Sequence, residues 1–142
     1  MTTDNLTIQA SYGQVPDAAR DIRTEVFVNE QGFQEEFDTT DHVAHHVVIY
    51  RDGASLGTGR VFLDHGTWHI GRLAVRKVHR GEHLGATILT ALEEIAHRHG
   101  ATSVTLNAQV RAQDFYTKQG YTAYGDTFLD EGCPHIAMRK SL

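Results

Sequence analysis

The chain has 142 residues, a formal net charge of −5 with histidine neutral, and a single cysteine, Cys133. This length suits one domain spanning 1–142. One cysteine excludes an intramolecular disulfide framework, and the acidic balance argues against a dedicated nucleic-acid binder, which needs a basic face. No apolar run reaches the roughly 18 residues of a membrane span, and the N-terminus has no secretory pattern. We therefore expect a cytoplasmic protein that binds neither nucleic acid nor membrane.

The first third of the chain predicts a strand, a helix and an acidic connection. Apolar and polar residues alternate over 6–12, as in a half-buried strand. Apolar residues from Ala18 to Phe27 keep helical spacing, and the helix should stop near Gly32. The stretch 33–42 is acidic and irregular, which predicts a short helix or a loop.

The rest of the chain alternates between strand and helix patterns. Turn signals such as Asp52-Gly53 separate three strands of an antiparallel meander, predicted over 46–51, 55–63 and 68–75. The second half predicts a helix over 84–99, a strand over 103–108, a short helix over 112–118, and strands over 121–128 and 136–139.

The resulting element order is β-α-β-β-β-α-β-α-β-β, with an optional helix in the acidic stretch. The strands at 68–75 and 103–108 flank a helix, so they should be parallel with a right-handed crossover. We therefore predict an α/β (α+β) fold with a mixed, mostly antiparallel sheet of six to seven strands and helices on both faces.

The junction between strand 68–75 and helix 84–99 predicts an anion-binding site. Free backbone N–H groups at the start of a helix lie at the positive end of its dipole. Gly81 and Gly85 allow a ligand to approach the backbone closely, and Arg80 adds a positive charge. An ordinary glycine turn that opens a core helix is the alternative interpretation.

Two separated motifs resemble the GNAT acetyltransferases. Arg80-Gly-Glu-His-Leu-Gly-Ala86 is similar to the family's acyl-CoA motif, Arg/Gln-x-x-Gly-x-Gly/Ala, whose loop cradles the pyrophosphate. The segment from Ala112 to Tyr121 resembles the downstream Ala-x-x-x-Tyr-x-Lys-x-Gly-Phe signature. His83 stands where the family usually has its first loop glycine, and it would still offer its N–H if its φ is negative.

Three further segments resemble one branch of that family, the YjcF/ElaA-like group: 23–32, 107–109 and 132–135. The resemblance implies a GNAT fold, acetyl-CoA as co-substrate and no metal. It also implies a homodimer, because GNAT domains often associate through sheet edges. The implied CoA-binding residues are Leu73, Ala74, Val75, Arg80, Gly81, Glu82, His83, Leu84, Gly85, Ala86, Asn107, Gln109 and Tyr116.

The resemblance further implies direct transfer of an acetyl group from acetyl-CoA to an amine of a small molecule, peptide or protein. Tyr116 is the candidate to protonate the leaving thiolate, unless it only packs in the core. The general base is open among the residues Glu30, Asp41, His45, His69, His83 and His135. We favour Glu30 at the end of the first helix, followed by His135 in the last hairpin.

The candidate acceptor-binding residues are Glu30, Asp41, His45, Arg60 and Arg72. An arginine inside a strand is costly unless it is paired, so Arg60 or Arg72 holds a substrate carboxylate or an internal acid, or faces solvent.

Four alternatives remain open at this stage. The chain could resemble acyl-homoserine-lactone synthases, or it could be a non-catalytic acyl-CoA sensor. Cys133 could form an acyl-cysteine with His135 as its base. His42, His45 and His46, with neighbouring acids, contain the ligand types of a metal site, although no zinc motif is present.

Overall fold

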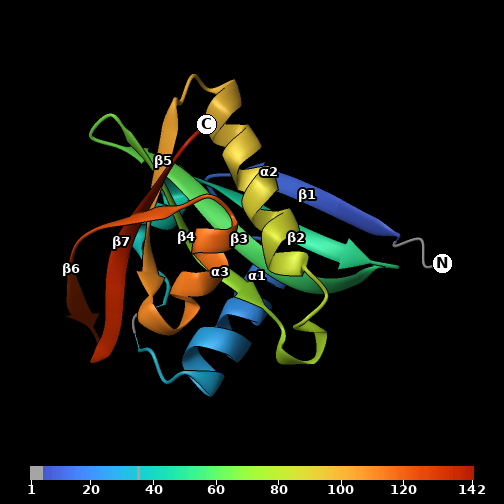
Figure 1. The fold of residues 1–142 in the computed structure, drawn as a ribbon. Helices are drawn as coiled ribbons and strands as arrows, with labels where there is room; N and C mark the ends of the chain where they lie inside the picture. Colours follow the sequence, from blue (N-terminus) through green and yellow to red (C-terminus); the bar gives the residue numbers. More distant parts are fainter. Residues whose placement is uncertain (1–4, 35) are drawn as a thin grey trace.

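The computed structural model describes residues 5–34 and 36–142. One seven-stranded sheet has the strand order β1-β2-β3-β4-β5-β7-β6, and helices pack on it (Figure 1). The strands are β1 (Leu6–Tyr12), β2 (Ala44–Arg51), β3 (Ala54–Asp64), β4 (Thr67–Val75), β5 (Ser103–Gln109), β6 (Thr122–Asp130) and β7 (Cys133–Ser141). The α-helices are α1 (Asp17–Arg23), α2 (Leu84–Arg98) and α3 (Gln113–Lys118).

The predicted mixed sheet is confirmed, with β4 and β5 as its parallel pair. The first helix differs from the expectation, because after α1 it continues as a π-helical segment, η1 (Thr24–Glu30). The acidic stretch contains a 3₁₀ turn, η2 (Thr39–Val43). No helix in the described residues is long and apolar enough to cross a membrane.

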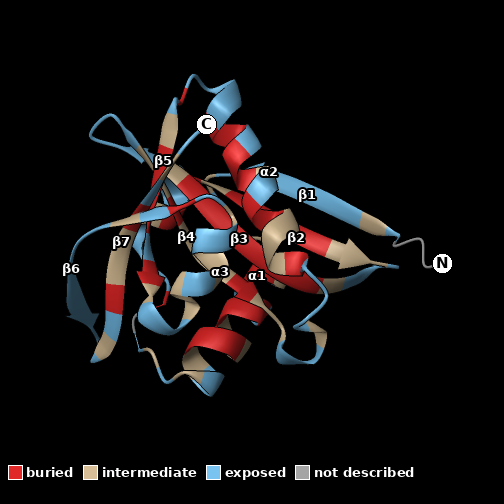
Figure 2. Cartoon of the chain, in the orientation of Figure 1, coloured by how far each residue is buried: buried red, intermediate tan, exposed pale blue. Residues whose placement is uncertain are grey.

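Buried side chains form a separate core on each face of the sheet (Figure 2). Successive strand residues point to opposite faces. Val47 therefore packs in the cluster that contains Ile88 of α2, whereas Val48 packs in the cluster that contains Ile22 of α1. The predicted helices on both faces are thus confirmed.

Two glycines of β3 allow α2 to lie close to the sheet. A Cβ added to Gly57 would lie 2.7 Å from Ile88 Cδ1 and 2.8 Å from the carbonyl oxygen of Ala74. A Cβ on Gly59 would lie 2.7 Å from Leu92 Cδ1. Because Gly57 and Gly59 have no side chains, the helix that follows the predicted anion loop can pack directly against β3.

Strands β4 and β5 separate soon after they meet. Their parallel pairing covers only His69 with Thr105 and Ile70 with Leu106. Beyond that point β4 pairs with β3 alone, and a bulge in β4 places two residues opposite Gly59 of β3. Arg72, in this bulge, has a left-handed φ of 51°. The bulge and the separation leave the inner edges of both strands without a partner strand.

We predict that Gly57→Ala destabilises the protein by about 1–3 kcal/mol, because the new methyl group would collide with backbone as well as with a side chain. Urea denaturation measures the difference. Gly71→Ala is the control, since its Cβ would meet only Arg60 Nε, at 4.0 Å. Equal unfolding midpoints for the two variants would contradict the packing argument.

Candidate active site

A cavity of about 900 Å³ opens where β4 and β5 separate. One wall is the β4 segment from Gly71 to Val75, and the opposite wall includes Asn107 and Gln109 of β5. Residues of the 26–38 region and Tyr116 of α3 complete the lining. The sequence motifs, which lie far apart along the chain, thus meet at one site.

At His83, the loop before α2 has a backbone conformation that is typical of glycine. His83, the residue before the helix, has φ 62° and ψ 19°, which is left-handed and not the negative φ that we expected. Histidine is among the residues that tolerate this region better than most. The backbone at His83 therefore takes a shape that a glycine would adopt without strain.

Arg80 is the part of this loop that reaches the cavity wall. Its Nε donates to the carbonyl oxygen of Val75 at 3.1 Å, and its two terminal nitrogens each donate to Glu30 at 2.7 Å. The remaining motif residues, Gly81 to Ala86, are not among the residues that line the cavity.

The ion pair with Arg80 changes the interpretation of Glu30. Hydrogen bonds from Arg80 lower the pKa of the Glu30 carboxyl. A carboxylate with a lowered pKa is a weaker proton acceptor. Glu30 also lines a separate, smaller cavity of about 250 Å³, together with Cys133. In this conformation Glu30 holds the loop arginine and is poorly suited to the base role for which the sequence favoured it.

Gly85 has a reason for being glycine that the motif does not suggest. A Cβ at this position would lie 3.2 Å from Cζ of Phe115, in α3. The glycine therefore allows α2 and α3 to pack closely, and α3 carries the tyrosine of the second motif.

Tyr116 lines the cavity with its ring packed against Phe115 and Tyr121, at centroid distances of 5.0 and 5.9 Å. Burial raises the pKa of the Tyr116 hydroxyl above its usual value. The hydroxyl is protonated at neutral pH, as in an ordinary tyrosine, and the raised pKa makes it a weaker acid.

Gln109 connects β5 to the N-terminal region. Its Nε2 donates to Gln31 Oε1 at 2.8 Å, and its Oε1 accepts from Arg111 Nε at 2.8 Å. Asn107, two residues earlier, is exposed and lines the cavity. The Gln109 side chain thus has a structural role, and of the two amides Asn107 is the more available for a ligand.

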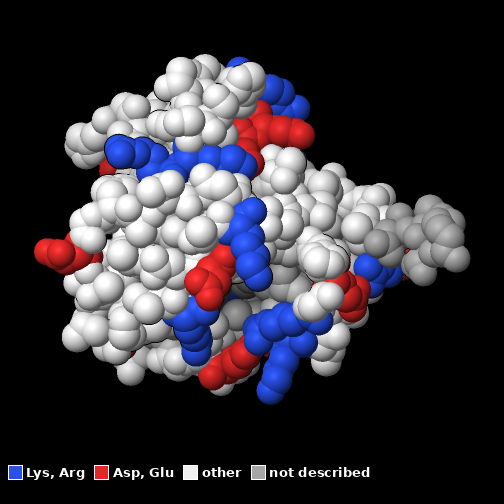
Figure 3. Space-filling model, in the orientation of Figure 1, with Lys and Arg blue, Asp and Glu red and all other residues white. Residues whose placement is uncertain are grey.

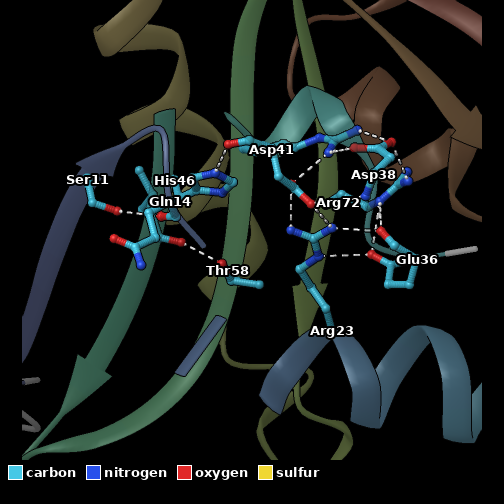
Figure 4. A network of polar contacts seen from close by, with 11 residues as sticks. Ser11, Gln14, Arg23, Glu36, Asp38, Asp41, His46, Thr58 and Arg72 are labelled. Atoms are coloured by element: carbon cyan, nitrogen blue, oxygen red, sulfur yellow. Dashed lines mark hydrogen bonds and ion pairs between the residues drawn. The ribbon is translucent and has the colours of Figure 1, made fainter. Parts of the chain in front are cut away.

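A network of three arginines and three carboxylates lies at the floor of the cavity (Figure 4). Arg23 donates to Glu36 Oε2 at 3.0 Å and to both oxygens of Asp41, at 2.9 and 3.1 Å. Arg60 donates to Asp38 Oδ1 at 2.7 Å and to Asp41 Oδ1 at 2.8 Å.

Arg72 completes the network from the β4 bulge. Its Nε lies 2.9 Å from Glu36 Oε2, and its Nη2 donates to Asp38 Oδ2 at 3.2 Å. Arg60 and Arg72 therefore both pair with internal acids, which is one of the alternatives that the sequence left open. Of the network residues, Arg23, Glu36, Asp41 and Arg60 are buried, each 5% exposed or less.

The carboxyl groups of the network differ in acidity. Burial opposes ionisation of Asp41, but hydrogen bonds and charge from Arg23 and Arg60 outweigh it and lower its pKa to about 2. Arg60 and Arg72 likewise lower the pKa of Asp38 against the effect of burial. Glu36 shows the opposite result, because burial raises its pKa in spite of Arg72 and Arg23.

The histidine candidates separate into two groups. His135 and His69 line the cavity, where His69 stacks on Phe62 at 5.2 Å and His135 stacks on Phe128 at 5.8 Å. His45 does not line it. Its ring instead packs against Tyr12, His99 and Trp68. Asp41 also lies outside the lining, engaged by the two arginines described above.

In the part of the chain that the structure describes, no hydrogen bond joins the Cys133 thiol to the His135 ring. His135 Nδ1 lies 2.8 Å from the carbonyl oxygen of Cys133, so this nitrogen is used by the backbone. No group of three or more metal-ligating side chains occurs in residues 5–34 and 36–142. The acids beside His42, His45 and His46 bind arginines instead.

Sequence reasoning missed Arg23, Glu36 and Asp38 as members of the site. The acidic stretch that contains Glu36 and Asp38 was treated as an irregular connection. Arg23 directly follows the buried Ile22, and a charge in that position was the available signal, because a buried arginine requires acidic partners.

Elsewhere, opposite charges lie next to one another on the face shown in Figure 3. The structure contains partly exposed pairs such as Arg51–Glu82 and Arg76–Glu25. Such exposed pairs contribute little stability each. They leave the visible face without a large patch of one sign.

Comparison with known proteins agrees with this geometry. Residues 10–142 match the Acetyltransferase (GNAT) domain. The chain is 39% identical over 122 residues to the uncharacterized N-acetyltransferase YjcF of Bacillus subtilis (strain 168), covering 84% of this chain and 87% of that protein. An acyl-CoA N-acyltransferase from Pseudomonas aeruginosa superposes with TM-score 0.84 at 30% identity, over 95% of this chain and 99% of that one.

ElaA of Escherichia coli has the same fold, with TM-score 0.84 at 24% identity, over 95% of this chain and 99% of that one. The protein is therefore an acyltransferase by fold and by relatives. The chain belongs to the GNAT acetyltransferase family, and the resemblance to its YjcF/ElaA-like branch is confirmed.

We predict that Asp41→Asn removes an acid-sensitive part of the stability. The folded-state pKa of Asp41, about 2, lies below its ordinary value of 3.8. Its carboxylate therefore stabilises the fold by about 2 kcal/mol above pH 3.8, and this contribution disappears as the pH falls towards 2.

Urea denaturation at several pH values from about 2 to 5 measures this effect. Asp41→Asn should flatten the dependence of unfolding free energy on pH, besides lowering it at neutral pH by about 3–5 kcal/mol. Asp126→Asn, at an exposed position of β6, is the control. An unchanged slope in Asp41→Asn would show that the network does not control acid stability.

Proposed function

We propose that the protein is an acetyl-CoA-dependent N-acetyltransferase that transfers the acetyl group directly to an amine of a small molecule or peptide. The observation that carries the proposal is the cavity between the separated strands β4 and β5, bordered by Arg80, Tyr116 and the unpaired edge of β4. A GNAT family acetyltransferase from Elizabethkingia anophelis with acetyl-CoA bound shares the fold, with TM-score 0.75 at 16% identity.

In this proposal each predicted residue set has a physical task. The α2 N-terminus and Arg80 hold the pyrophosphate, because free N–H groups and a guanidinium both favour phosphate. The backbone of Leu73 to Val75 pairs with the pantetheine arm and can donate to the thioester oxygen as charge develops. Asn107 supplies a further amide at the opposite wall.

Tyr116 is proposed to donate its proton to the sulfur of the leaving CoA. The amine nitrogen forms a bond to the acetyl carbon, the carbon–sulfur bond breaks, and the thiolate is protonated. The raised pKa makes this tyrosine a weaker acid, so the proton moves only as negative charge develops on the sulfur, and the tyrosine regains a proton readily afterwards. The alternative function, an acyl-CoA sensor, would require the residues that bind CoA but no proton donor.

Calorimetry with acetyl-CoA, combined with a thiol-release assay over a panel of primary amines, tests the function. Binding and amine-dependent release of CoA thiol are expected. Binding without turnover on any amine would favour the sensor, and no binding of any acyl-CoA would overturn the proposal.

The predicted homodimer stays a prediction. The edge strand β6, with exposed Tyr124, Phe128 and Leu129, offers a contact surface for it.

We predict that Arg80→Ala weakens CoA binding about 10- to 100-fold, because charge-assisted hydrogen bonds to phosphate are lost. The matched variant is Glu30→Gln, which weakens the competing intramolecular partner and should bind CoA severalfold more tightly. Calorimetric Kd values measure both. Equal affinities for wild type and Arg80→Ala would exclude Arg80 from the pyrophosphate site.

We predict that Tyr116→Phe lowers kcat by on the order of a hundredfold and leaves the Kd for CoA nearly unchanged. Tyr124→Phe is the control, since its hydroxyl bonds Thr105 Oγ1 at 2.6 Å and it does not line the cavity. Steady-state thiol release gives kcat for both variants. A full kcat in Tyr116→Phe, with chemistry rate-limiting, would remove Tyr116 from the donor role.

A further inference from the structure

Glu36 is the residue to which the geometry of the cavity floor points. We propose that Glu36 receives the acceptor amine as an ammonium ion and removes its proton before acetyl transfer. This inference rests on the proposed function and assigns its general base to a residue that the sequence motifs do not mark. Glu36 is 4% exposed, and it lines the cavity.

Of the two carboxylate oxygens of Glu36, only Oε2 is contacted by arginines in the described part of the chain. Its Oε2 accepts from Arg23 Nε at 3.0 Å and lies 2.9 Å from Arg72 Nε. Within residues 5–34 and 36–142, no donor bonds its Oε1. By contrast, both oxygens of Asp38 and both oxygens of Asp41 accept bonds from arginines. Of these three carboxylates, Glu36 alone has an oxygen left for a ligand.

The backbone around Glu36 is fixed by the same two arginines. The carbonyl oxygen of Glu36 accepts from Arg23 Nη2 at 2.7 Å and from Arg72 Nε at 3.0 Å. Arg23 comes from α1 and Arg72 from β4, so two separate elements hold the residue (Figure 4). A carboxylate held in this way keeps its orientation when a substrate arrives.

Glu36 is placed next to the segment that would hold the thioester. Arg72, its partner, occupies the β4 bulge, and the residues that follow, Leu73 to Val75, line the same cavity. The proposed function assigns these residues to pantetheine and thioester. An amine bound at Oε1 would therefore stand beside the acetyl carbon that it must attack.

The electrostatic environment suits a base. Burial raises the pKa of Glu36, although Arg72, Arg23 and Arg60 all act to lower it. Asp38 and Asp41 face the same arginines and share their charge. A carboxylate with a raised pKa takes up a proton more readily than an ordinary glutamate.

The lining also indicates the class of acceptor. Four phenylalanines contribute to the lining of the cavity, namely Phe27, Phe33, Phe37 and Phe62. Rings favour a cation and an apolar body, whereas Arg60 and Arg72 are already occupied by internal acids. We therefore expect a primary amine on an apolar or aromatic body.

The step balances as follows. The ammonium nitrogen gives one proton to Glu36 Oε1, and the neutral amine attacks the thioester carbon. The carbon–nitrogen bond forms and the carbon–sulfur bond breaks. The nitrogen then loses a second proton to water, and Tyr116 gives its proton to the CoA sulfur and regains one from solvent. Glu36 returns its proton to solvent, so one proton is released overall.

The test compares wild type with Glu36→Gln in the thiol-release assay, using acetyl-CoA and the best substrate among an arylalkylamine, an alkyl diamine and an α-amino acid. In Glu36→Gln we expect kcat/KM to fall about 10²- to 10⁴-fold at neutral pH. The variant should regain activity about tenfold per pH unit, because only amine that is neutral in solution then reacts. Wild type should instead reach a plateau above the pKa of Glu36.

Two further variants separate this role from a structural one. Glu36→Asp keeps the charge in the network and withdraws the carboxylate, so it should fold, bind CoA normally and lose kcat. Asp38→Asn removes an acid of the same network whose oxygens are both occupied. Asp38→Asn should lower the free energy of unfolding, but its kcat/KM should not acquire the steep pH dependence that we expect for Glu36→Gln.

The outcomes are distinguishable. Wild-type turnover with equal pH profiles for wild type and Glu36→Gln would overturn the assignment of Glu36 and leave the proposed function intact. A fully active Glu36→Asp would also overturn it. Absence of CoA binding or turnover in the wild type would overturn the proposed function, and the base assignment with it.

Discussion

The separation of two parallel strands is the constraint on which the site depends. β4 and β5 pair at only two positions, so each continues with one edge that has no partner in the sheet. Backbone N–H and C=O groups need partners, and a ligand with amide groups can provide them. The loop that precedes the helix connecting the two strands contributes Arg80 to the wall of this opening.

The ion network also fixes the position of an irregular segment that lines the cavity. Residues 36–38 lie outside the helices and strands, and hydrogen bonds from Arg23, Arg60 and Arg72 hold Glu36 and Asp38 in place. Buried charges require partners, so removing any one member would leave another uncompensated. The same network that fixes the segment leaves one carboxylate oxygen open to the cavity, which joins stability to the proposed chemistry.

Two of the non-glycine residues with a left-handed φ lie close to this site. Arg72 and His83 both have a left-handed φ, and neither is glycine. The first belongs to the bulge that aims a guanidinium at Glu36, and the second shapes the turn into α2. Such conformations cost about 1–3 kcal/mol each and persist where the surrounding structure enforces them.

The sequence by itself determined the element order, the parallel pair and the position of the anion loop, because hydrophobic periodicity and turn residues act locally. It also indicated that Arg60 or Arg72, lying inside strand patterns, binds a carboxylate unless it faces solvent. Only the tertiary structure decided which acids these are, since Arg23 and Glu36 lie 13 residues apart and Arg72 and Glu36 lie 36 apart. It likewise tied Glu30 to Arg80 and left Glu36 open, because a carboxylate's role depends on which of its oxygens a folded neighbour occupies.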